Sequence, residues 1–369
     1  METSITPHII CVGACYIDTI LDVPHFPAED DKLRATNLSK RRGGNGGNTL
    51  EVLAQLRNIS KSNPNGPKRP DLNHLLPAKL SMMAVLPNPK STASKMIKAS
   101  LQGVNLDQCV YRYDQDEAAS SYIIRSKESG SRTIVNHNAL PDMTVEEFIE
   151  AAQGFDSNDT EGSDRNYEWW HFEGRIPEVT AKCMRYIAKT RSEAMISVEV
   201  ENPGRKGLKQ LAEVAHVVFY SKSWAWAQGY NNPTNFLQKL DDQSRPLQFC
   251  TWGAEGAAAL AFSRQEPDKK LLIKSQWSLP PSSKVVDTIG AGDTFMAGIL
   301  FAYAANPTNI NDSIHTRVAL EFALELAGRK VIQEGFSGLG EAVRDSVSSN
   351  FTITMKTLII IWCAKAEDP

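Results

Sequence analysis

The chain has 369 residues, 41% of them hydrophobic, which is enough for one large α/β domain or two ordinary ones with a sizeable core. Lys and Arg total 40, Asp and Glu total 43, and the formal net charge is -3. This balance gives no global field that would draw the protein to nucleic acid or to an anionic membrane, so we expect neither as a partner.

The cysteines and the apolar runs indicate a reduced cytoplasmic protein. Six cysteines in a chain of this length form neither a dense disulfide framework nor a zinc spacing, so we expect free, mostly buried thiols at Cys11, Cys15, Cys109, Cys183, Cys250 and Cys363. The start, METSITPHIICVGA, lacks the basic flank and long apolar core of a secretory signal. The apolar run TLIIIWCA is far shorter than the about 20 residues that a membrane helix needs.

Short apolar, β-rich runs alternate with longer helical patterns along the chain. In chain order these strand and helix pairs are 8–14 with 49–56, 79–85 with 91–102, 168–174 with 178–190, and 194–200 with 205–215. Further strands are predicted at 216–220 and 246–252, and two long helices between 291 and 331. Because this alternation is typical of a parallel sheet with crossover helices, it predicts a doubly wound, mostly parallel α/β fold.

Two stretches interrupt this rhythm with half-polar, alternating strand patterns, at 21–42 and at 120–136. The second contains the turn SKESGSR, which predicts a hairpin. Both are expected to form a small separate sheet that either covers a cleft as a lid or mediates dimerisation through its edge. Segments 61–77 and 156–167 are rich in turn-forming residues and are expected to be inserted surface loops.

The string VVDTIGAGDTFMAG, which begins at Val285, runs through a glycine turn into an apolar helical pattern. Gly290 and Gly292 lack Cβ atoms where backbone amides would approach a ligand, and a helix from Thr294 onward would direct free N–H groups at it. Such a turn predicts an anion site for phosphate. Asp293 would repel phosphate there, so the residues alone leave two roles open for it: a chemical role or the helix cap.

The string RRGGNGGNTLEVLAQL, which begins at Arg41, places two amide side chains, Asn45 and Asn48, at the start of a predicted helix. Such a polar surface can bond several sugar hydroxyls, although an ordinary glycine-rich turn with an Asn cap remains the alternative. Asp18 follows the first predicted strand, at the edge where open α/β sheets bind ligands. The alternative for Asp18 is a solvated loop carboxylate.

Together, the strings GGNGGN and DTIGAGDTFMAG resemble the two signature motifs of the PfkB family of ribokinase-like carbohydrate kinases. Similar strings follow in the family's order at ESGSRTI, WWHFEGR, CTWGAEGA and AGRKVIQEGFSG. The resemblance covers nearly all of Ile9 to Gly340 and is greatest to the ketohexokinases. It implies a ribokinase-like kinase domain at 1–340 with a β-sheet lid, and leaves 341–369 as a C-terminal extension without a counterpart.

The resemblance also implies residue roles. Asp293 would be the catalytic base, and the amides of Gly290, Ala291 and Gly292 would form the anion hole. The sugar would be held by Asp18, Gly44, Asn45 and Asn48, and Arg132 would approach the phosphates from the lid. The nucleotide groove would be lined by Gly253, Glu255, Gly256, Ala257, Ala327, Gly328 and Val331.

The activity so implied is transfer of the γ-phosphate of ATP to a primary hydroxyl of a small carbohydrate, above all a ketohexose such as fructose, giving its 1-phosphate. The resemblance implies ATP and Mg²⁺ as cofactors, K⁺ as an activating ion, and a homodimer joined through the lid. The metal ligands stay open, because the usual metal motif is not clear around Glu199, Glu201 and Asn202. Two alternatives remain: a PfkB-type kinase for ribose, a nucleoside or a sugar acid, and a non-catalytic sugar or nucleotide sensor.

Overall fold

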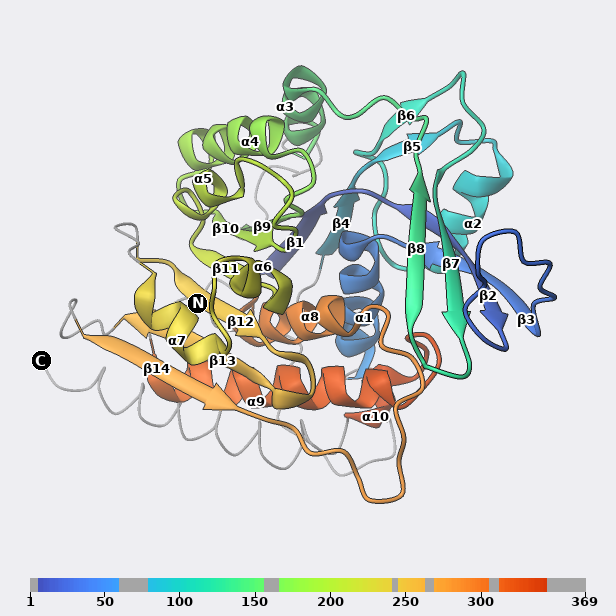
Figure 1. Ribbon diagram of the computed structural model, residues 1–369. Helices are drawn as coiled ribbons and strands as arrows, with labels where there is room; N and C mark the ends of the chain where they lie inside the picture. Colours follow the sequence, from blue (N-terminus) through green and yellow to red (C-terminus); the bar gives the residue numbers. More distant parts are fainter. Residues whose placement is uncertain are drawn as a thin grey trace, which may run out of the picture.

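A computed structural model of the protein describes residues 6–59, 79–155, 166–240, 245–262, 269–304 and 312–343. Its main layer is an eight-stranded sheet in the order β14-β13-β12-β11-β10-β9-β1-β4 (Figure 1). Strands β12, β11, β10, β9, β1 and β4 pair in parallel, whereas β13 and β14 are antiparallel. The strands are β1 (Thr6–Val12), β4 (Lys79–Met83), β9 (Asn166–Phe172), β10 (Met195–Val200), β11 (Val217–Tyr220), β12 (Leu247–Thr251), β13 (Ala257–Phe262) and β14 (Lys270–Ser275).

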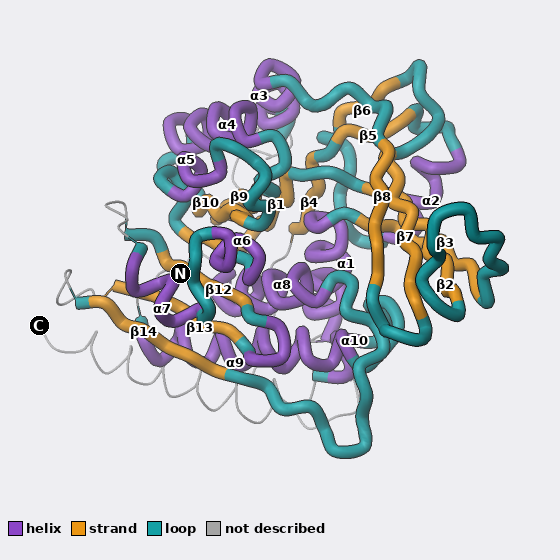
Figure 2. Tube along the Cα trace, viewed as in Figure 1, coloured by secondary structure: helices purple, strands orange, loops and turns teal. Residues whose placement is uncertain are grey.

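Helices cover both faces of this sheet, as the purple segments in Figure 2 show. One hydrophobic core draws on α1 (Asn45–Ile59), α2 (Thr92–Ser100), α8 (Ala291–Ala304), α9 (Ser313–Val331) and α10 (Leu339–Ala342). The other core draws on α3 (Val145–Gln153), α4 (Pro177–Thr190), α5 (Leu208–Ala212), α6 (Lys222–Ala227) and α7 (Pro233–Lys239). The expected doubly wound α/β class is confirmed.

The strand sequences explain this layering. Neighbouring residues on β9, Trp169 and Trp170, are both fully buried but belong to opposite cores, as do Ile9 and Ile10 on β1. Successive strand side chains point to opposite faces, so a run that is apolar at every position can only lie in a sheet that is covered on both sides.

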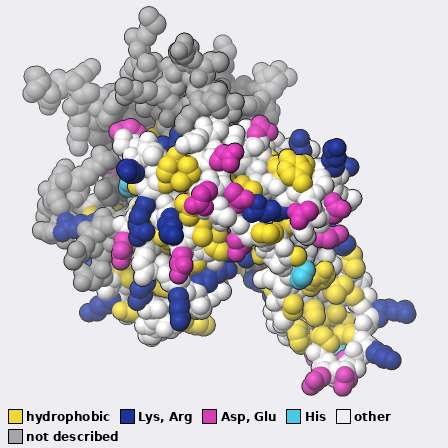
Figure 3. Space-filling view, turned by 90° about the horizontal axis from the view of Figure 1, so that it is seen from above, with side chains coloured by type: hydrophobic (Ala, Val, Ile, Leu, Met, Phe, Trp, Pro, Cys, Tyr) yellow, Lys and Arg dark blue, Asp and Glu magenta, His cyan; other side chains and the backbone are white. Residues whose placement is uncertain are grey.

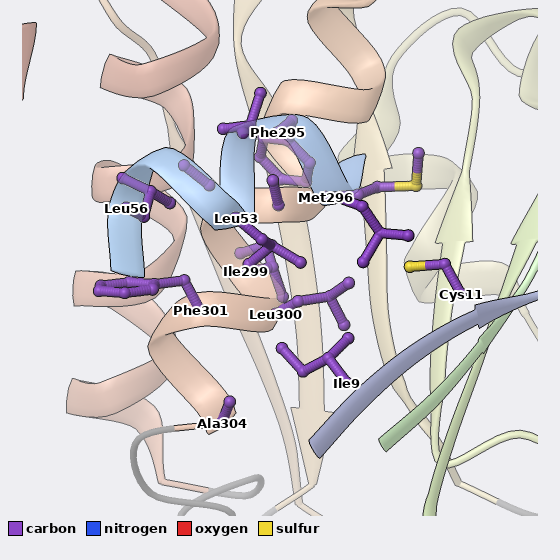
Figure 4. Packing of buried hydrophobic residues seen from close by; sticks show 14 of the residues in the cluster. Ile9, Cys11, Leu53, Leu56, Phe295, Met296, Ile299, Leu300, Phe301 and Ala304 are labelled. Atoms are coloured by element: carbon purple, nitrogen blue, oxygen red, sulfur yellow. The ribbon is translucent and has the colours of Figure 1, made fainter. Parts of the chain in front are cut away.

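Helices α1 and α8 pack side by side over the sheet. Leu53 and Leu56 of α1 meet Phe295 and Ile299 of α8 in a core that reaches down to Ile9 on β1 (Figure 4). Because the two helices are held together along this apolar contact, their N-terminal turns lie together at the carboxyl edge of the parallel strands. Those two turns carry the two glycine-rich motifs.

A separate four-stranded sheet, the lid, has the order β3-β2-β7-β8. Its strands are β3 (Asn37–Gly43), β2 (Tyr16–Val23), β7 (Ala119–Ser126) and β8 (Arg132–His137). The expected small separate sheet is therefore confirmed, although β2 begins at Tyr16, earlier than the pattern predicted. The reason is that the alternation of buried and half-buried side chains on β2 already starts there. A further pair, β5 (Val85–Pro87) and β6 (Val110–Arg112), was not foreseen.

Helix α8 begins at Ala291, where the helical region was predicted to start, because the carbonyl of Gly290 already accepts the first helical hydrogen bond, from Thr294 N at 2.9 Å. One expected boundary was wrong. Asn166 and Tyr167 belong to β9 and not to a loop, because they continue the parallel pairing with β1. The rest of that predicted loop, 156–165, the predicted loop 61–77 and the extension beyond residue 343 lie outside the described residues.

The five described cysteines, Cys11, Cys15, Cys109, Cys183 and Cys250, are free and buried, whereas Cys363 lies outside the described residues. Within the described segments, no helix has the length and apolar character needed to cross a membrane.

Candidate active site

The two glycine-rich motifs meet through a direct hydrogen bond. Asn48 Nδ2 donates to Asp293 Oδ2 at 2.6 Å, although the two residues are 245 positions apart, and Thr49 Oγ1 donates to the Asp293 carbonyl at 3.2 Å. Arg42 Nη1 donates to Asn48 Oδ1 at 2.7 Å, and its Nη2 pairs with Glu51. Since a guanidinium can only donate, it holds the amide oxygen on its own side and directs the amide NH₂ group at Asp293.

Asp293 lies in the first turn of α8, three residues after Gly290, and is therefore not the N-cap residue. Gly290 has φ +81°, and a Cβ there would lie 2.3 Å from Phe336 Cζ, so only glycine allows this entry into the helix. The first N–H groups of a helix have no partner within it, and the turn that carries them here also carries the buried Asp293 side chain. This turn therefore combines the features predicted for an anion site with the candidate base.

Buried carboxylates raise one another's pKa at this site. The pKa of Asp293 lies well above its usual value, first because of burial and then because of the charge of Glu199, while the Asn48 hydrogen bond opposes the shift. Burial, with Glu173 and Glu201, likewise raises the pKa of Glu199 well above its usual value. A carboxylate with a raised pKa is a stronger base than an ordinary aspartate, which suits proton abstraction.

A cavity of about 110 Å³ opens between the carboxyl ends of β10, β11 and β12 and the first turns of α1 and α8. Two hydrogen bonds join lining residues of this cavity: Asn45 Nδ2 donates to Glu199 Oε2 at 2.7 Å and to Glu201 Oε2 at 3.3 Å. The lining residues are Asn45, Glu199, Glu201, Phe219, Tyr220, Ser221, Phe249, Thr251, Gly292, Asp293, Phe295 and Met296.

Asp18 projects from the lid toward the same edge. It lies on β2 directly opposite Arg41 of β3 and Ser121 of β7, so the three side chains share one face of the lid. Burial raises the pKa of Asp18, and a hydrogen bond from Ser121 opposes that shift. A Cβ on Gly43 would lie 2.3 Å from Asp18 Oδ1, and one on Gly44, where φ is +98°, 2.2 Å from a backbone carbonyl. Gly43 therefore lets the turn into α1 pass close to Asp18, and Gly44 lets it pass close to the backbone at Ala14.

Both edge strands of the lid contact the loop that precedes the glycine turn. Arg132 on β8 donates from Nη1 to Thr288 Oγ1, and Arg41 on β3 donates from Nη1 to Asp287 Oδ2 at 2.9 Å. The structure thus places Arg132 beside the glycine turn. The contact of Arg41 was not predicted, because only the register of β3 brings its side chain to this face of the lid.

Asp287 is held by a second cation, Lys330, which is fully buried at the end of α9. Lys330 Nζ donates to Asp287 Oδ2 and to its carbonyl, both at 2.9 Å, and Gly335 N donates to Oδ2 at 3.2 Å. Burial alone would raise the pKa of Asp287, but Arg41 and Lys330 outweigh it and lower the pKa to about 2. Lys330 was not among the predicted site residues, since the sequence shows it only as one basic residue of the string AGRKVIQEGFSG.

Two of the residues predicted for the nucleotide groove, Gly256 and Gly328, border one segment, Ser275 to Trp277. A Cβ on Gly256, where φ is +88°, would lie 2.1 Å from Ser275 O, and a Cβ on Gly328 would lie 2.2 Å from Trp277 Cε3. Tight packing thus accounts for both glycines. Of the others, Gly253, Glu255 and Ala257 lie in the turn before β13 or at its start, and Ala327 and Val331 lie in the last turns of α9.

Comparison with known proteins decides the family. The profile of the pfkB family carbohydrate kinases matches residues 6–337. The chain belongs to the PfkB family. Ketohexokinase of Mus musculus is 30% identical over 341 residues, which cover 90% of this chain and 98% of that protein. The expected family is confirmed, and with it a kinase that uses an alcohol group of a carbohydrate as the acceptor.

Solved structures share the ribokinase-like fold of this PfkB kinase. Ribokinase from Giardia lamblia superposes with a TM-score of 0.68 at 16% identity, covering 94% of this chain and 99% of its own. Arabidopsis thaliana ribokinase, complexed with ribose and ATP, superposes with a TM-score of 0.59 at 18% identity, covering 90% and 94%.

Replacing Asp287 in this PfkB kinase by Asn should destabilise the fold by about 3 kcal/mol, because it leaves the buried Lys330 ammonium without its counter-charge. Urea unfolding measures the change, and Asp287→Asn with Lys330→Met should recover part of the loss. The folded pKa of about 2 lies below the ordinary 3.8, so this stabilisation is present above about pH 4 and is lost as the pH falls toward 2. An Asp287→Asn variant as stable as the wild type at pH 7 would contradict this account.

Proposed function

We propose that this PfkB kinase transfers the γ-phosphate of ATP to a primary hydroxyl of a ketohexose such as fructose, giving the 1-phosphate. The observation that carries the proposal is the 2.6 Å hydrogen bond from Asn48 to Asp293, because it joins a hydroxyl-binding turn to a base beside an anion site. The 30% identity with a ketohexokinase along nearly the whole chain supports this sugar over the others.

In this proposal the sugar lies between the lid and α1. The Asp18 carboxylate accepts hydrogen bonds from sugar hydroxyls, and the amides of Asn45 and Asn48 donate to and accept from others. Gly44 allows the sugar to approach the backbone, since no side chain stands in the way. Without sugar, the Asn45 amide donates to Glu199 and Glu201, and the Asn48 amide donates to Asp293. The sugar hydroxyls replace these carboxylates as partners, so sugar binding also frees the Asp293 carboxylate for the reaction.

Asp293 then takes the proton of the attacking primary hydroxyl. The new bond forms between that oxygen and the γ-phosphorus, the bond from the γ-phosphorus to the bridging oxygen breaks, and ADP leaves with the electron pair. The amides of Gly290, Ala291 and Gly292 and the guanidinium of Arg132 offset the charge on the group in transfer. The contact of Arg132 with Thr288 supports this role, since it holds the cation beside the turn.

ATP is proposed to lie along the groove formed by the turn Gly253–Ala257 and the end of α9, and an ATP complex of a structural relative supports this. Among the described residues, no group of three or more Asp, Glu, His or Cys side chains is arranged to hold a metal by itself. Glu199 and Glu201 nevertheless fit Mg²⁺, which binds through one or two carboxylates together with substrate phosphates. Bound there, Mg²⁺ would neutralise phosphate charge.

The test is ATP-dependent phosphorylation by the purified protein across fructose, tagatose, ribose, adenosine and 2-keto-3-deoxygluconate, with and without Mg²⁺ and K⁺. Turnover of fructose to the 1-phosphate is the expected result. If only another acceptor is phosphorylated, that acceptor replaces fructose as the proposed substrate, and the proposed roles of the site residues stay the same. Binding of sugar and nucleotide without turnover would instead show that the protein is a non-catalytic sensor.

Asp293→Asn should lower kcat by about 10² to 10⁴-fold while ATP binding survives, because the variant lacks the general base. In the wild type, kcat/KM should decrease as the pH is lowered, and the half-point of this decrease should lie above the usual pKa range of aspartate. The reason is that the base must be deprotonated and its pKa is raised. Asn48→Leu removes a hydrogen bond that favours the carboxylate, so it should move this acid limb to still higher pH. Near-wild-type turnover of Asp293→Asn would refute the assignment.

We also propose that two copies associate through the outer face of the lid. Leu38, Tyr122 and Val135 share that face, opposite the face of Asp18, and are 59%, 49% and 58% exposed. Hydrophobic side chains gather on the projecting lobe at lower right in Figure 3, on the side where Figure 1 shows the lid. Neighbouring apolar side chains left in water at the edge of a sheet favour association with a second copy.

Val135→Glu should convert a dimer to a monomer in sedimentation velocity, because it places a charge in the apolar contact. Tyr113→Glu is the matched control: Tyr113 is 72% exposed and lies outside the lid strands, so this variant should remain dimeric. A wild type that is monomeric at micromolar concentration, or a dimer that survives Val135→Glu, would contradict the proposed interface.

A further inference from the structure

A row of polar groups lies within the main sheet and leads to the active-site cavity. Trp169 and His171 are two positions apart on β9, and Ser197 and Glu199 are two positions apart on β10. Because side chains two positions apart point to the same face, and Ser197 pairs in register with His171, all four share one face. None of them is more than 4% exposed. Buried polar groups are costly without hydrogen bonds, so this row needs partners.

The four side chains provide these partners for one another. Trp169 Nε1 donates to Ser197 Oγ at 2.8 Å, and Ser197 Oγ lies 2.8 Å from His171 Nδ1. His171 Nε2 lies 3.2 Å from Glu199 Oε1, and Glu199 lines the cavity. The row therefore connects a tryptophan in the core to a carboxyl group at the site.

This order of contacts assigns the tautomer of His171. An indole N–H can only donate, so Trp169 takes Ser197 Oγ as its acceptor and leaves the hydroxyl hydrogen for His171 Nδ1. Burial disfavours the charged imidazolium, and a neutral ring that accepts at Nδ1 carries its hydrogen on Nε2. His171 so assigned donates from Nε2 to Glu199. The Phe219 ring packs edge-on against the imidazole, with centroids 5.7 Å apart, and restricts its rotation.

Neutral donors thus hold Glu199 at both of its oxygens. His171 faces Oε1, and Asn45 Nδ2 donates to Oε2 at 2.7 Å. Such donors orient a carboxylate without neutralising it, whereas a lysine or arginine in the same place would form an ion pair. The same Asn45 amide reaches Glu201, which brings a second carboxyl group beside the first. This arrangement suits a carboxylate that binds a cation.

The two donors differ once sugar is bound in the proposed reaction. The Asn45 amide then turns to sugar hydroxyls and gives up its hydrogen bond to Glu199. His171 is 1% exposed, so a substrate does not reach it, and its contact with Glu199 persists. His171 is therefore the donor that still orients Glu199 during phosphoryl transfer.

We propose that His171 is a positioning residue that orients the Glu199 carboxylate toward Mg²⁺, and that Ser197 and Trp169 hold His171 in the tautomer this requires. The inference rests on the proposed use of ATP with Mg²⁺. Residues that hydrogen-bond a metal ligand typically change metal affinity by about 10- to 100-fold. The proposal gives this role to polar side chains that an apolar core does not need.

The experiment measures how strongly Mg²⁺ promotes nucleotide binding. The dissociation constant of β,γ-imido-ATP is determined by calorimetry with EDTA and again with saturating Mg²⁺. The ratio of the first constant to the second is compared among the wild type, His171→Leu, His171→Gln and Ser197→Ala. A change in folding or in the nucleotide groove alters both constants alike and leaves this ratio unchanged.

His8→Leu is the matched control. His8 is also a buried histidine of the main sheet, and its Nε2 lies 2.8 Å from the hydroxyl of Ser81. It pairs in register with Glu168, three residues before His171, and thus lies further from the carboxyl edge of the strands. This variant should leave the ratio unchanged.

His171→Leu should lower the ratio about 10-fold or more, because Glu199 loses the donor that orients it. Ser197→Ala should lower it about two- to fivefold, because the ring stays but loses the hydrogen bond that sets its tautomer. His171→Gln should retain most of the wild-type ratio, since its amide NH₂ can take the place of Nε2–H. If His171→Leu does not fold, Ser197→Ala and His171→Gln carry the test.

An unchanged ratio in His171→Leu or in Ser197→Ala would overturn the inference. So would a His171→Gln variant as impaired as His171→Leu, or an equal loss in His8→Leu, since the effect would then be one of packing. A wild type that binds the analogue equally well with and without Mg²⁺ would also overturn it. A wild type that binds no analogue would overturn this inference and the proposed function together. If the ratios follow the expected pattern but no sugar is phosphorylated, the inference stands and only the proposed function fails.

Discussion

The hydrogen bond between Asn48 and Asp293 is the contact on which the site depends. It joins the first turns of α1 and α8, which the chain separates by 245 residues and which the apolar packing of the two helices brings together. Arg42 orients the amide, so the interaction has a direction: the NH₂ group faces the carboxylate, and the carbonyl faces the cation. Burial raises the pKa of Asp293 well above its usual value, and the hydrogen bond from Asn48 opposes this shift. In the proposed reaction this bond gives the carboxylate one donor until the acceptor hydroxyl binds.

Charge is divided between two sides of the same cleft. The floor carries carboxyl groups, of which Glu199 and Asp293 have strongly raised pKa values because they are buried close to one another. The lid carries the cations Arg41 and Arg132, and Lys330 at the end of α9 converges with Arg41 on Asp287, in the loop before the glycine turn. In the proposed reaction, a phosphate that enters between the two sides would meet hydrogen-bond donors on one side and the base Asp293 on the other.

The two faces of the lid serve different purposes because strand side chains alternate. The face that contains Asp18, Arg41 and Ser121 turns to the cleft, and its polar groups are buried against the loop at Asp287. The opposite face presents Leu38, Tyr122 and Val135 to solvent. A shift of one residue in the register of β2 against β3 would exchange these faces and remove Asp18 from the site. The same strand order thus sets both the proposed sugar contact of Asp18 and the proposed association of two copies.

The sequence by itself determined the doubly wound class, the separate lid sheet and the family, because the periodicity of apolar residues and the two glycine-rich strings are local properties of the chain. It singled out Asp18, Asn48 and Asp293 as candidates but gave no partner for any of them. Only the tertiary structure decided that Asn48 bonds Asp293, that Arg41 and Lys330 share Asp287, and that His171 lies against Ser197 and Glu199. The physical reason is that most of these contacts join residues from distant segments, and that helix packing, strand register and burial, which set their distances and pKa values, arise only when the whole chain is folded.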